Sequence, residues 1–273
     1  MIIEYFRPKR ISEAIDLLSN NEMDIVPMGG GSNLHRLANK PFAVLDLQEL
    51  GLNRIKERSN YLEIGATVTL QSLLNTEGLP ADIYQVIRLE ATYNLRQVAT
   101  IAGTLVASDG RSPFSAVLLA LDASLILVPG LNEVSRQDVL ADKVSLSDLL
   151  ITREKFLHRR MITQVKIPMN VRLAYEYVAR TPADLPIVCV ALAHWPSGRT
   201  RLVLGGYGTS PQLAMDGIDP SGIELVARDA YSQAGDHWGA ADYRQEIAGV
   251  LANRCWEKIN TGANDDKRSI EIA

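Results

Sequence analysis

Two stretches of small residues, far apart in the chain, have the composition of phosphate-binding loops. The first, residues 27–34, reads Pro-Met-Gly-Gly-Gly-Ser-Asn-Leu and follows the apolar pair at 25–26. Three consecutive glycines permit positive φ angles and let backbone N–H groups approach an anion, and Ser32 and Asn33 add side-chain donors. Because a lone glycine loop is more often a structural turn, the interpretation depends on the second stretch.

The second stretch, residues 100–109, reads Thr-Ile-Ala-Gly-Thr-Leu-Val-Ala-Ser-Asp. Its Gly103 stands between Thr100 and Thr104, so a small residue is again combined with hydroxyl donors. We predict a second loop here that grips a diphosphate from the side opposite the first loop, without a lysine. Such a pair of loops is typical of a dinucleotide cofactor site.

The composition limits the class of protein. The chain has 273 residues, 47% of them apolar and 22% charged, with a formal net charge of −4. This acidic balance argues against a nucleic-acid or membrane-surface partner. The first ten residues carry charges where a signal peptide is apolar, and Asp122 interrupts the longest apolar stretch, so we expect a cytoplasmic protein with no membrane segment.

Cysteine and histidine usage predicts no metal site. Cys189 and Cys255 are too few and too far apart to bind an iron–sulfur cluster or a structural zinc ion. We expect two reduced, buried thiols. The four histidines are scattered, with no pair spaced to share one face of a helix.

The apolar spacing predicts a β-α-β unit in residues 1–50. Residues 11–20 have helical spacing with Ser12 as N-cap, and strands at 24–28 and 43–47 flank the first glycine loop. Further helices are expected at 70–75, 81–89, 115–121, 222–234 and 242–258, and further strands at 61–66, 123–128, 161–167, 174–178, 187–194 and 200–206. Residues 130–148 are interpreted as a connector and 260–268 as a frayed polar tail.

These elements add up to an α+β protein. We predict a domain 1–168 with sub-parts 1–55 and 56–168, and a smaller C-terminal α+β domain 169–273 of a three-stranded sheet and helices. The best ligand cleft is expected between the two sub-parts.

An ordered series of motifs resembles the FAD-binding subunits of the molybdenum hydroxylases, the family of xanthine dehydrogenase and of the carbon monoxide dehydrogenase medium subunit. The series covers nearly the whole chain: residues 28–34, Leu-Asp-Leu at 45–47, Ile-Gly-Ala at 64–66, residues 95–105, Leu-Asp-Ala at 121–123, residues 162–168 and Tyr-Arg at 243–244. The resemblance implies a two-part FAD-binding domain of the vanillyl-alcohol-oxidase-like type.

The resemblance also implies a role for each motif. FAD would be held through its diphosphate by the two loops, with its isoalloxazine ring near Met161 and Ile162. The expected cofactor-binding residues are Met28, Gly29, Gly30, Gly31, Ser32, Asn33, Leu34, Thr100, Ala102, Gly103, Thr104, Asp109 and Ile162. FAD would take electrons from the [2Fe–2S] clusters of a small subunit, in a complex with a molybdopterin-binding large subunit, and pass them to NAD or another acceptor. No catalytic side chain is predicted.

Several residues depart from the family pattern around the flavin. Pro113 replaces an aspartate, Tyr177 a lysine, Leu185 a frequent aromatic residue and Ala102 a glycine. Two alternatives therefore stay open: a stand-alone flavin reductase, because residues 29–34 also resemble the loop of UDP-N-acetylenolpyruvylglucosamine reductase, and a flavin-free scaffold that keeps the fold.

Two polar residues near the second stretch have competing interpretations. Asp109 either holds the ribityl hydroxyls of the flavin or is a turn aspartate ahead of Gly110. Arg96 either contacts a phosphate or pairs with a carboxylate such as that of Glu90.

Overall fold

The computed structural model describes residues 1–271 apart from 21, 38–39 and 130–140, and these residues form two compact units. Unit 1 comprises Met1–Glu77, Ala91–Ala107 and Asp122–Ile167, and unit 2 comprises Gly78–Glu90, Ser108–Leu121 and Pro168–Ala273. Most of the predicted connector 130–148 lies outside the described residues. The last segment of unit 2 begins at the predicted boundary, but two earlier segments join it. The division into domains 1–168 and 169–273 stays a prediction.

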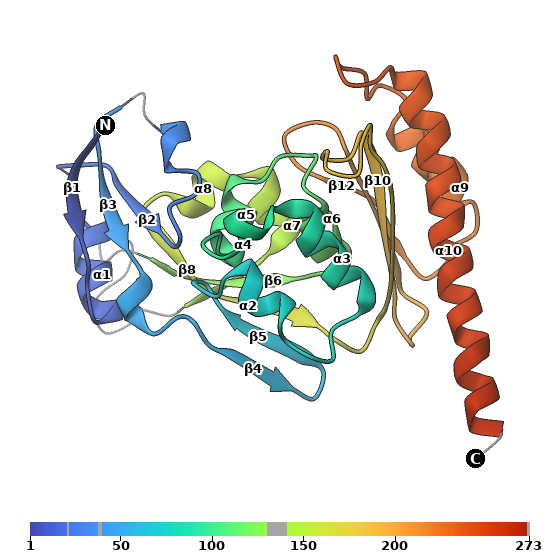
Figure 1. The fold of residues 1–273 in the computed structure, drawn as a ribbon, viewed down its shortest axis with the longest axis horizontal. Coiled ribbons are helices and arrows are strands. Elements are labelled where there is room, and N and C mark those ends of the chain that lie inside the picture. The colour runs from blue at the N-terminus through green and yellow to red at the C-terminus, as the bar shows by residue number, and fades with distance from the viewer. Residues whose placement is uncertain (21, 38–39, 130–140, 272–273) are drawn as a thin grey trace. The chain divides into compact units, whose positions relative to one another are not determined.

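Unit 1 begins with a small parallel sheet. Its strands, in the order β1-β3-β2, are β1 (Ile2–Phe6), β3 (Phe42–Asp46) and β2 (Ile25–Met28). Helix α1 (Ile11–Leu18) connects β1 to β2 and buries Ala14, Ile15 and Leu18 in the same apolar core as Leu45. The predicted β-α-β arrangement is confirmed, and the glycine segment follows directly from the end of β2 (Figure 1).

A five-stranded sheet completes the strands of unit 1. In the order β4-β5-β8-β6-β7 they are β4 (Ile55–Arg58), β5 (Tyr61–Gly65), β8 (Arg160–Pro168), β6 (Ser124–Pro129) and β7 (Asp142–Ser145). Its helices are α2 (Leu70–Leu74), α4 (Tyr93–Arg96), α5 (Ile101–Ala107), α7 (Leu146–Ile151) and α8 (Arg153–Leu157), with the single-turn 3₁₀ helices η1 (Leu34–Leu37) and η2 (Gln48–Leu50).

The prediction of a loop over residues 100–109 is wrong for most of that stretch, because Ile101–Ala107 form helix α5. Burial explains the difference. Ile101, Ala102, Thr104 and Leu105 are buried at helical spacing, so one face of the helix packs into the core and the glycine is accommodated within it.

Unit 2 is built around an antiparallel sheet with both faces covered. Its strands, in the order β12-β11-β10-β9, are β12 (Gln212–Gly217), β11 (Thr200–Gly205), β10 (Val188–His194) and β9 (Arg172–Val178). Figure 1 shows α9 (Ile223–Ala230) and α10 (Ala241–Glu271) side by side on one face, with α3 (Ala81–Glu90) and α6 (Pro113–Ala120) on the other. The α+β class is confirmed.

Alternation along β10 explains this layering. Val188, Val190 and Leu192 belong to the core that includes the α10 residues Leu251 and Cys255. The intervening residues face the layer of α6, all eight of whose residues are buried. A strand buried on both faces is continuously apolar, as β10 is from Val188 to Ala193.

Two predictions about the C-terminal half have clear outcomes. Both cysteines are free and buried, as expected, and burial raises the pKa of each thiol, that of Cys189 to about 12. The frayed tail predicted for residues 260–268 is wrong, because α10 continues to Glu271.

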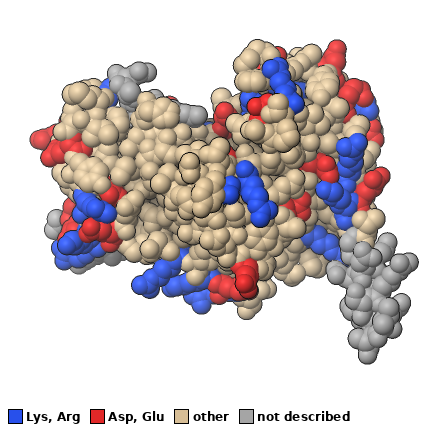
Figure 2. All heavy atoms as spheres, in the orientation of Figure 1, with Lys and Arg blue, Asp and Glu red and all other residues tan. Residues whose placement is uncertain are grey.

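The surface and the helices carry two further observations. Acidic and basic side chains are interspersed on the face drawn in Figure 2. Among the described residues, no helix combines the length and apolar character needed to cross a membrane.

Candidate cofactor site

The two glycine-containing stretches lie against each other in unit 1. An ideal Cβ on Gly29 would stand 2.3 Å from Oγ1 of Thr100, and one on Gly30 would stand 1.6 Å from the carbonyl oxygen of Val98. No side chain fits in either place. The prediction that these distant stretches form one site therefore has a physical basis: the first can approach the second only through residues without a Cβ.

The parallel sheet positions the first wall of the site. Leu47 N donates to Met28 O at 3.0 Å, so the chain leaves β2 and β3 at the same edge of the sheet. The buried carboxylate of Asp46 then accepts a hydrogen bond from Gln48 N at 3.0 Å. This contact fixes the turn into η2, and Gln48 lies next to the glycine segment as a result.

The segment between β5 and α2 forms the opposite wall. Thr69 is the N-cap of α2, where its Oγ1 accepts a hydrogen bond from Ser72 N at 3.1 Å. Leu70 N donates to Ala99 O and Ile101 N donates to Val68 O, both at 2.9 Å. These bonds hold residues 68–70 alongside residues 99–101.

The walls enclose a cleft of about 380 Å³. It is lined by Gly29, Gly30, Gln48, Asn53, Thr67, Val68, Thr69, Ser72, Gln97, Val98 and Thr100. The lining is polar, yet it contains no charged side chain. Any negative charge bound here is therefore met by amides and hydroxyls rather than by a cation.

Backbone donors in this cleft come from the first segment. Among the described residues, the N–H groups of residues 29–33 form no backbone hydrogen bond. Those of residues 101–104 have acceptors within the unit: Val68 O, Ala66 O, Thr100 Oγ1 and Thr100 O, respectively. The sequence analysis predicted N–H groups available to a ligand in both stretches. For the second stretch this prediction is wrong, because its residues form α5 and their N–H groups already have acceptors.

Thr100 keeps a donor despite these contacts. Its Oγ1 accepts the hydrogen bond of Gly103 N at 3.2 Å, and a hydroxyl that accepts still has its own proton to donate. Thr100 lines the cleft, so this O–H can serve a ligand there.

The predicted site residues fall into three groups. Gly29, Gly30 and Thr100 line the cleft. Adjoining it in the chain are Met28, Gly31, Ser32, Asn33 and Leu34, with Gly31 at φ 70°. The rest lie elsewhere: Ala102, Gly103 and Thr104 within α5, Ile162 buried in β8, and Asp109 in unit 2.

The two polar residues with competing interpretations have local partners. Asp109 Oδ1 accepts a hydrogen bond from Arg111 N at 2.8 Å, the geometry of a turn aspartate. Arg96 Nε donates to Gln71 Oε1 at 2.7 Å, so its partner is an amide rather than the carboxylate of Glu90.

Two of the departures from the family pattern, Pro113 and Tyr177, have local contacts in unit 2. Pro113 is the first residue of α6, a position that needs no N–H, behind the N-cap Ser112. Glu90 Oε2 accepts hydrogen bonds from Ser112 Oγ at 2.8 Å and Phe114 N at 3.1 Å. Burial raises the pKa of Glu90 to about 7, and Asp109 adds to the rise. Tyr177 stacks on Tyr175, with ring centroids 5.8 Å apart.

Sequence reasoning missed eight of the eleven residues that line the cleft. The residues not anticipated are Gln48, Asn53, Thr67, Val68, Thr69, Ser72, Gln97 and Val98. One signal was available: Thr67 and Thr69 follow the Ile-Gly-Ala motif at 64–66, immediately before a helix that Thr69 caps. Asn53 lies in a loop and carries no such signal.

The donor set suits a dinucleotide. A diphosphate is an oxyanion that accepts hydrogen bonds, and glycine N–H groups beside a strand end, together with threonine and amide side chains, are the groups that bind it without a cation. Residues 29–33, Thr100 and the amide-bearing wall thus fit the diphosphate region of such a cofactor.

Comparisons with known proteins agree with this geometry. Residues 1–170 match the family model described as the FAD binding domain in molybdopterin dehydrogenase. The uncharacterised protein YgfM of Escherichia coli is 27% identical over 92% of this chain and 94% of its own. The carbon monoxide dehydrogenase medium chain of Afipia carboxidovorans is 25% identical over 96% of this chain and 98% of its own.

A solved structure of the Cu,Mo-CO dehydrogenase has the same fold. It matches with a TM-score of 0.76 at 23% identity and covers 96% of this chain and 98% of that one. The chain therefore belongs to the family of FAD-binding domains in molybdopterin dehydrogenases and is an FAD-binding medium subunit of the molybdenum hydroxylase type, a subunit of an oxidoreductase.

Proposed function

We propose that this chain is the electron-transferring subunit of a molybdopterin-dependent dehydrogenase or hydroxylase. It takes electrons from the [2Fe–2S] clusters of a small subunit, in a complex with a molybdopterin-binding large subunit, and delivers them to NAD or another acceptor. The observation that supports this proposal most is the uncharged cleft of unit 1, with its glycine N–H groups opposite Thr100.

Each wall of the cleft has a part in holding FAD. The N–H groups of residues 29–33 bind the diphosphate, and the hydroxyl of Thr100 donates to it from the other side. Asn53 and Gln97 are exposed amides in the lining and add hydrogen bonds at the open side. FAD supplies a carrier that accepts two electrons and releases them singly or together.

The cysteines support an outside source for the electrons. A [2Fe–2S] cluster needs four protein ligands, usually thiolates, whereas this chain has two cysteines, both buried in unit 2. The clusters accordingly reside on a partner. Relatives carry the names medium chain and medium subunit, which fits a place within a larger complex.

The first test is FAD binding by the purified full-length chain. We expect visible flavin absorbance to persist after excess FAD is removed. Replacing two cleft amides, Asn53→Ala with Gln97→Ala, should raise the Kd for FAD by about 5- to 150-fold, since each lost hydrogen bond is worth about 0.5–1.5 kcal/mol. Flavin fluorescence titration measures it.

Gln233→Ala is the matched control, because it removes an exposed amide from unit 2 and should leave the Kd unchanged. If the double variant binds FAD as tightly as this control, the assignment of the cleft is wrong.

The acceptor is tested separately by anaerobic stopped-flow. The chain reduced at its flavin is mixed with NAD⁺, and recovery of flavin absorbance on the timescale of turnover supports NAD as acceptor. Recovery only with a quinone, ferredoxin or oxygen would replace NAD while leaving the electron-transfer role intact.

A further inference from the structure

Trp238 of unit 2 is held on a rigid turn with its ring half-exposed. Asp236 Oδ1 accepts hydrogen bonds from Trp238 N at 2.7 Å and Gly239 N at 3.2 Å. The same oxygen accepts from Arg244 Nη2 at 2.8 Å, and the Arg244 side chain is fully buried. These hydrogen bonds hold the backbone at Trp238 in place and involve no atom of its indole ring.

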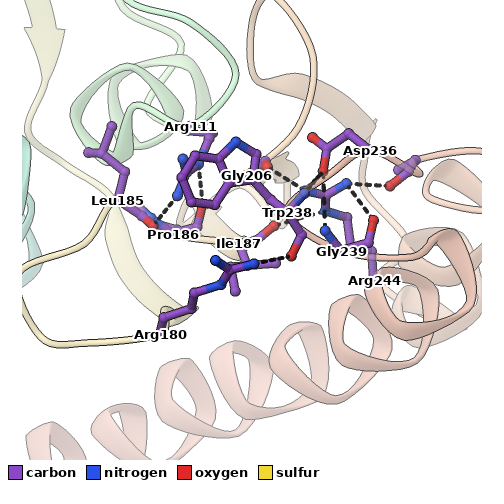
Figure 3. Close-up of polar contacts among 11 residues, drawn as sticks. Arg111, Arg180, Leu185, Pro186, Ile187, Gly206, Asp236, Trp238, Gly239 and Arg244 are labelled. Carbon is purple, nitrogen blue, oxygen red and sulfur yellow. Dashed lines mark hydrogen bonds and ion pairs between the residues drawn. The ribbon is translucent and has the colours of Figure 1, made fainter.

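Two guanidinium groups from distant parts of unit 2 contact that ring (Figure 3). Arg111 lies over the indole at 4.1 Å from its centroid and Arg180 at 5.1 Å. Arg111 is anchored by Leu185 O at 2.6 Å and Pro186 O at 3.0 Å. Arg180 is exposed, and its hydrogen bond to the described residues is a long one, 3.5 Å from Nη2 to Trp238 O.

Both cations lack a carboxylate partner. Among the described residues, neither Arg111 nor Arg180 forms an ion pair, and the one carboxylate of the cluster, Asp236, is engaged by Arg244. Asp109, Asp236 and Asp184 act on Arg111 electrostatically, but none of them forms an ion pair with it among the described residues. Two like charges beside one ring repel each other, and an incoming oxyanion would relieve that repulsion.

We propose that Arg111, Trp238 and Arg180 form a docking site for a carboxylate-bearing segment of a partner protein. Tryptophan and arginine are the residue types that carry most of the binding energy at protein interfaces. The free edge of Arg180 suits a carboxylate. Because the chain as a whole is acidic, with a formal charge of −4, a local cationic site also selects where an acidic partner can approach.

A protein partner fits this site better than a small ligand. Arg111, Arg180 and Trp238 line neither the cofactor cleft nor the cleft formed by residues of the segments 18–25 and 158–159. Trp238 is half-exposed and Arg180 is exposed, whereas small ligands favour concave pockets that bury most of their surface. This proposal rests on the proposed function in one respect: it requires that the chain be a subunit that binds other proteins.

The test titrates the full-length, FAD-loaded chain with a decaglutamate peptide at low ionic strength. Isothermal titration calorimetry gives the affinity, and tryptophan fluorescence gives a second readout. We expect Arg180→Gln to weaken binding at least fivefold. Arg111→Lys keeps the charge but loses the planar stack and the two carbonyl contacts, and should weaken binding less than Arg111→Gln.

Arg88→Gln is the matched control, since it removes one exposed charge from the same unit and should change the affinity less than twofold. Equal affinities for Arg180→Gln, Arg111→Gln and this control would overturn the proposal. Inorganic phosphate binding as tightly as the peptide would replace the partner with a small oxyanion. Flavin content measured on the same samples keeps a failure of docking distinct from a failure of FAD binding.

Discussion

At the scale of single residues, the glycines of the cleft are needed for packing as well as for the binding that we propose. Gly29 and Gly30 lack the atom that would collide with Thr100 and Val98. The absence of side chains therefore closes the site and exposes N–H groups at once. At Glu90 two effects oppose each other. Two hydrogen-bond donors stabilise the ionised carboxylate, whereas burial destabilises it and raises its pKa.

Glu90 should make the stability of the protein depend on pH. Its pKa is raised from 4.5 to about 7, so the folded state holds the proton more tightly than the unfolded state. The stabilisation is complete below pH about 4.5 and is lost as the pH rises through about 7. Glu90→Gln, which keeps an acceptor for Ser112, should flatten this part of the profile and raise stability at pH 8.

Urea denaturation from pH 4.5 to 8 measures the effect. Glu257→Gln is the control, because it makes the same change at an exposed position of α10 and should leave the slope as it is. A wild-type slope in Glu90→Gln would contradict the prediction.

At the scale of elements, one side chain of α10 fastens the loops at one end of the unit 2 sheet. Arg244 donates to the carbonyl oxygens of Ile187 at 3.1 Å, Gly206 at 3.2 Å, Ala234 at 2.6 Å and Gly239 at 3.2 Å. These lie just before β10, just after β11 and in the turn between α9 and α10. The ordering of these connections depends on a single guanidinium, whose five donors suit such a role.

Arg244→Met should lower the free energy of unfolding by about 3 kcal/mol or more, because the four carbonyl oxygens and the Asp236 carboxylate lose the hydrogen bonds of a buried guanidinium. Thermal and urea unfolding measure the loss. Arg254→Met on the exposed side of the same helix should cost less than about 0.5 kcal/mol. Similar losses of unfolding free energy in the two variants would show that the buried hydrogen bonds of Arg244 do not stabilise the protein more than an exposed arginine does.

At the scale of the whole molecule, the proposed function places an anionic cofactor in an uncharged cleft of an acidic chain. The net negative charge of the chain weakly repels the negatively charged diphosphate. The lining described for the cleft contains no lysine or arginine to offset this repulsion. Affinity then depends on short-range hydrogen bonds, which salt does not screen.

FAD affinity should accordingly change less than about threefold between about 20 and 500 mM NaCl, with any trend toward tighter binding. Flavin fluorescence titrations across this range test it. A tenfold loss of affinity at high salt would mean that a cation outside the described lining holds the diphosphate.

The sequence predicted what local patterns encode. The β-α-β unit and the pairing of two glycine-containing stretches were visible, and so were three strands of the C-terminal sheet. The predicted three-stranded sheet is wrong in number, because β12 (Gln212–Gly217) adds a fourth strand. The helix at 101–107 was not, because small residues permit loop and helix alike and the burial of Ile101 and Leu105 decided between them. Asn53, Gln97 and the Arg111–Trp238 contact depend on tertiary approach, for which these residues carry no periodic signal.

The order in which the units use the chain has a consequence for biosynthesis. Helix α6 is made early, at Pro113–Ala120, but the sheet it covers is completed only at β12, Gln212–Gly217. Until then the growing chain carries a helix whose eight residues are all buried in the finished protein, and of its main packing partners among the described residues only helix α3 precedes it in the chain. Nascent chains of intermediate length should be natural clients for a chaperone, and neither unit can be exchanged between relatives by a single crossover in the gene.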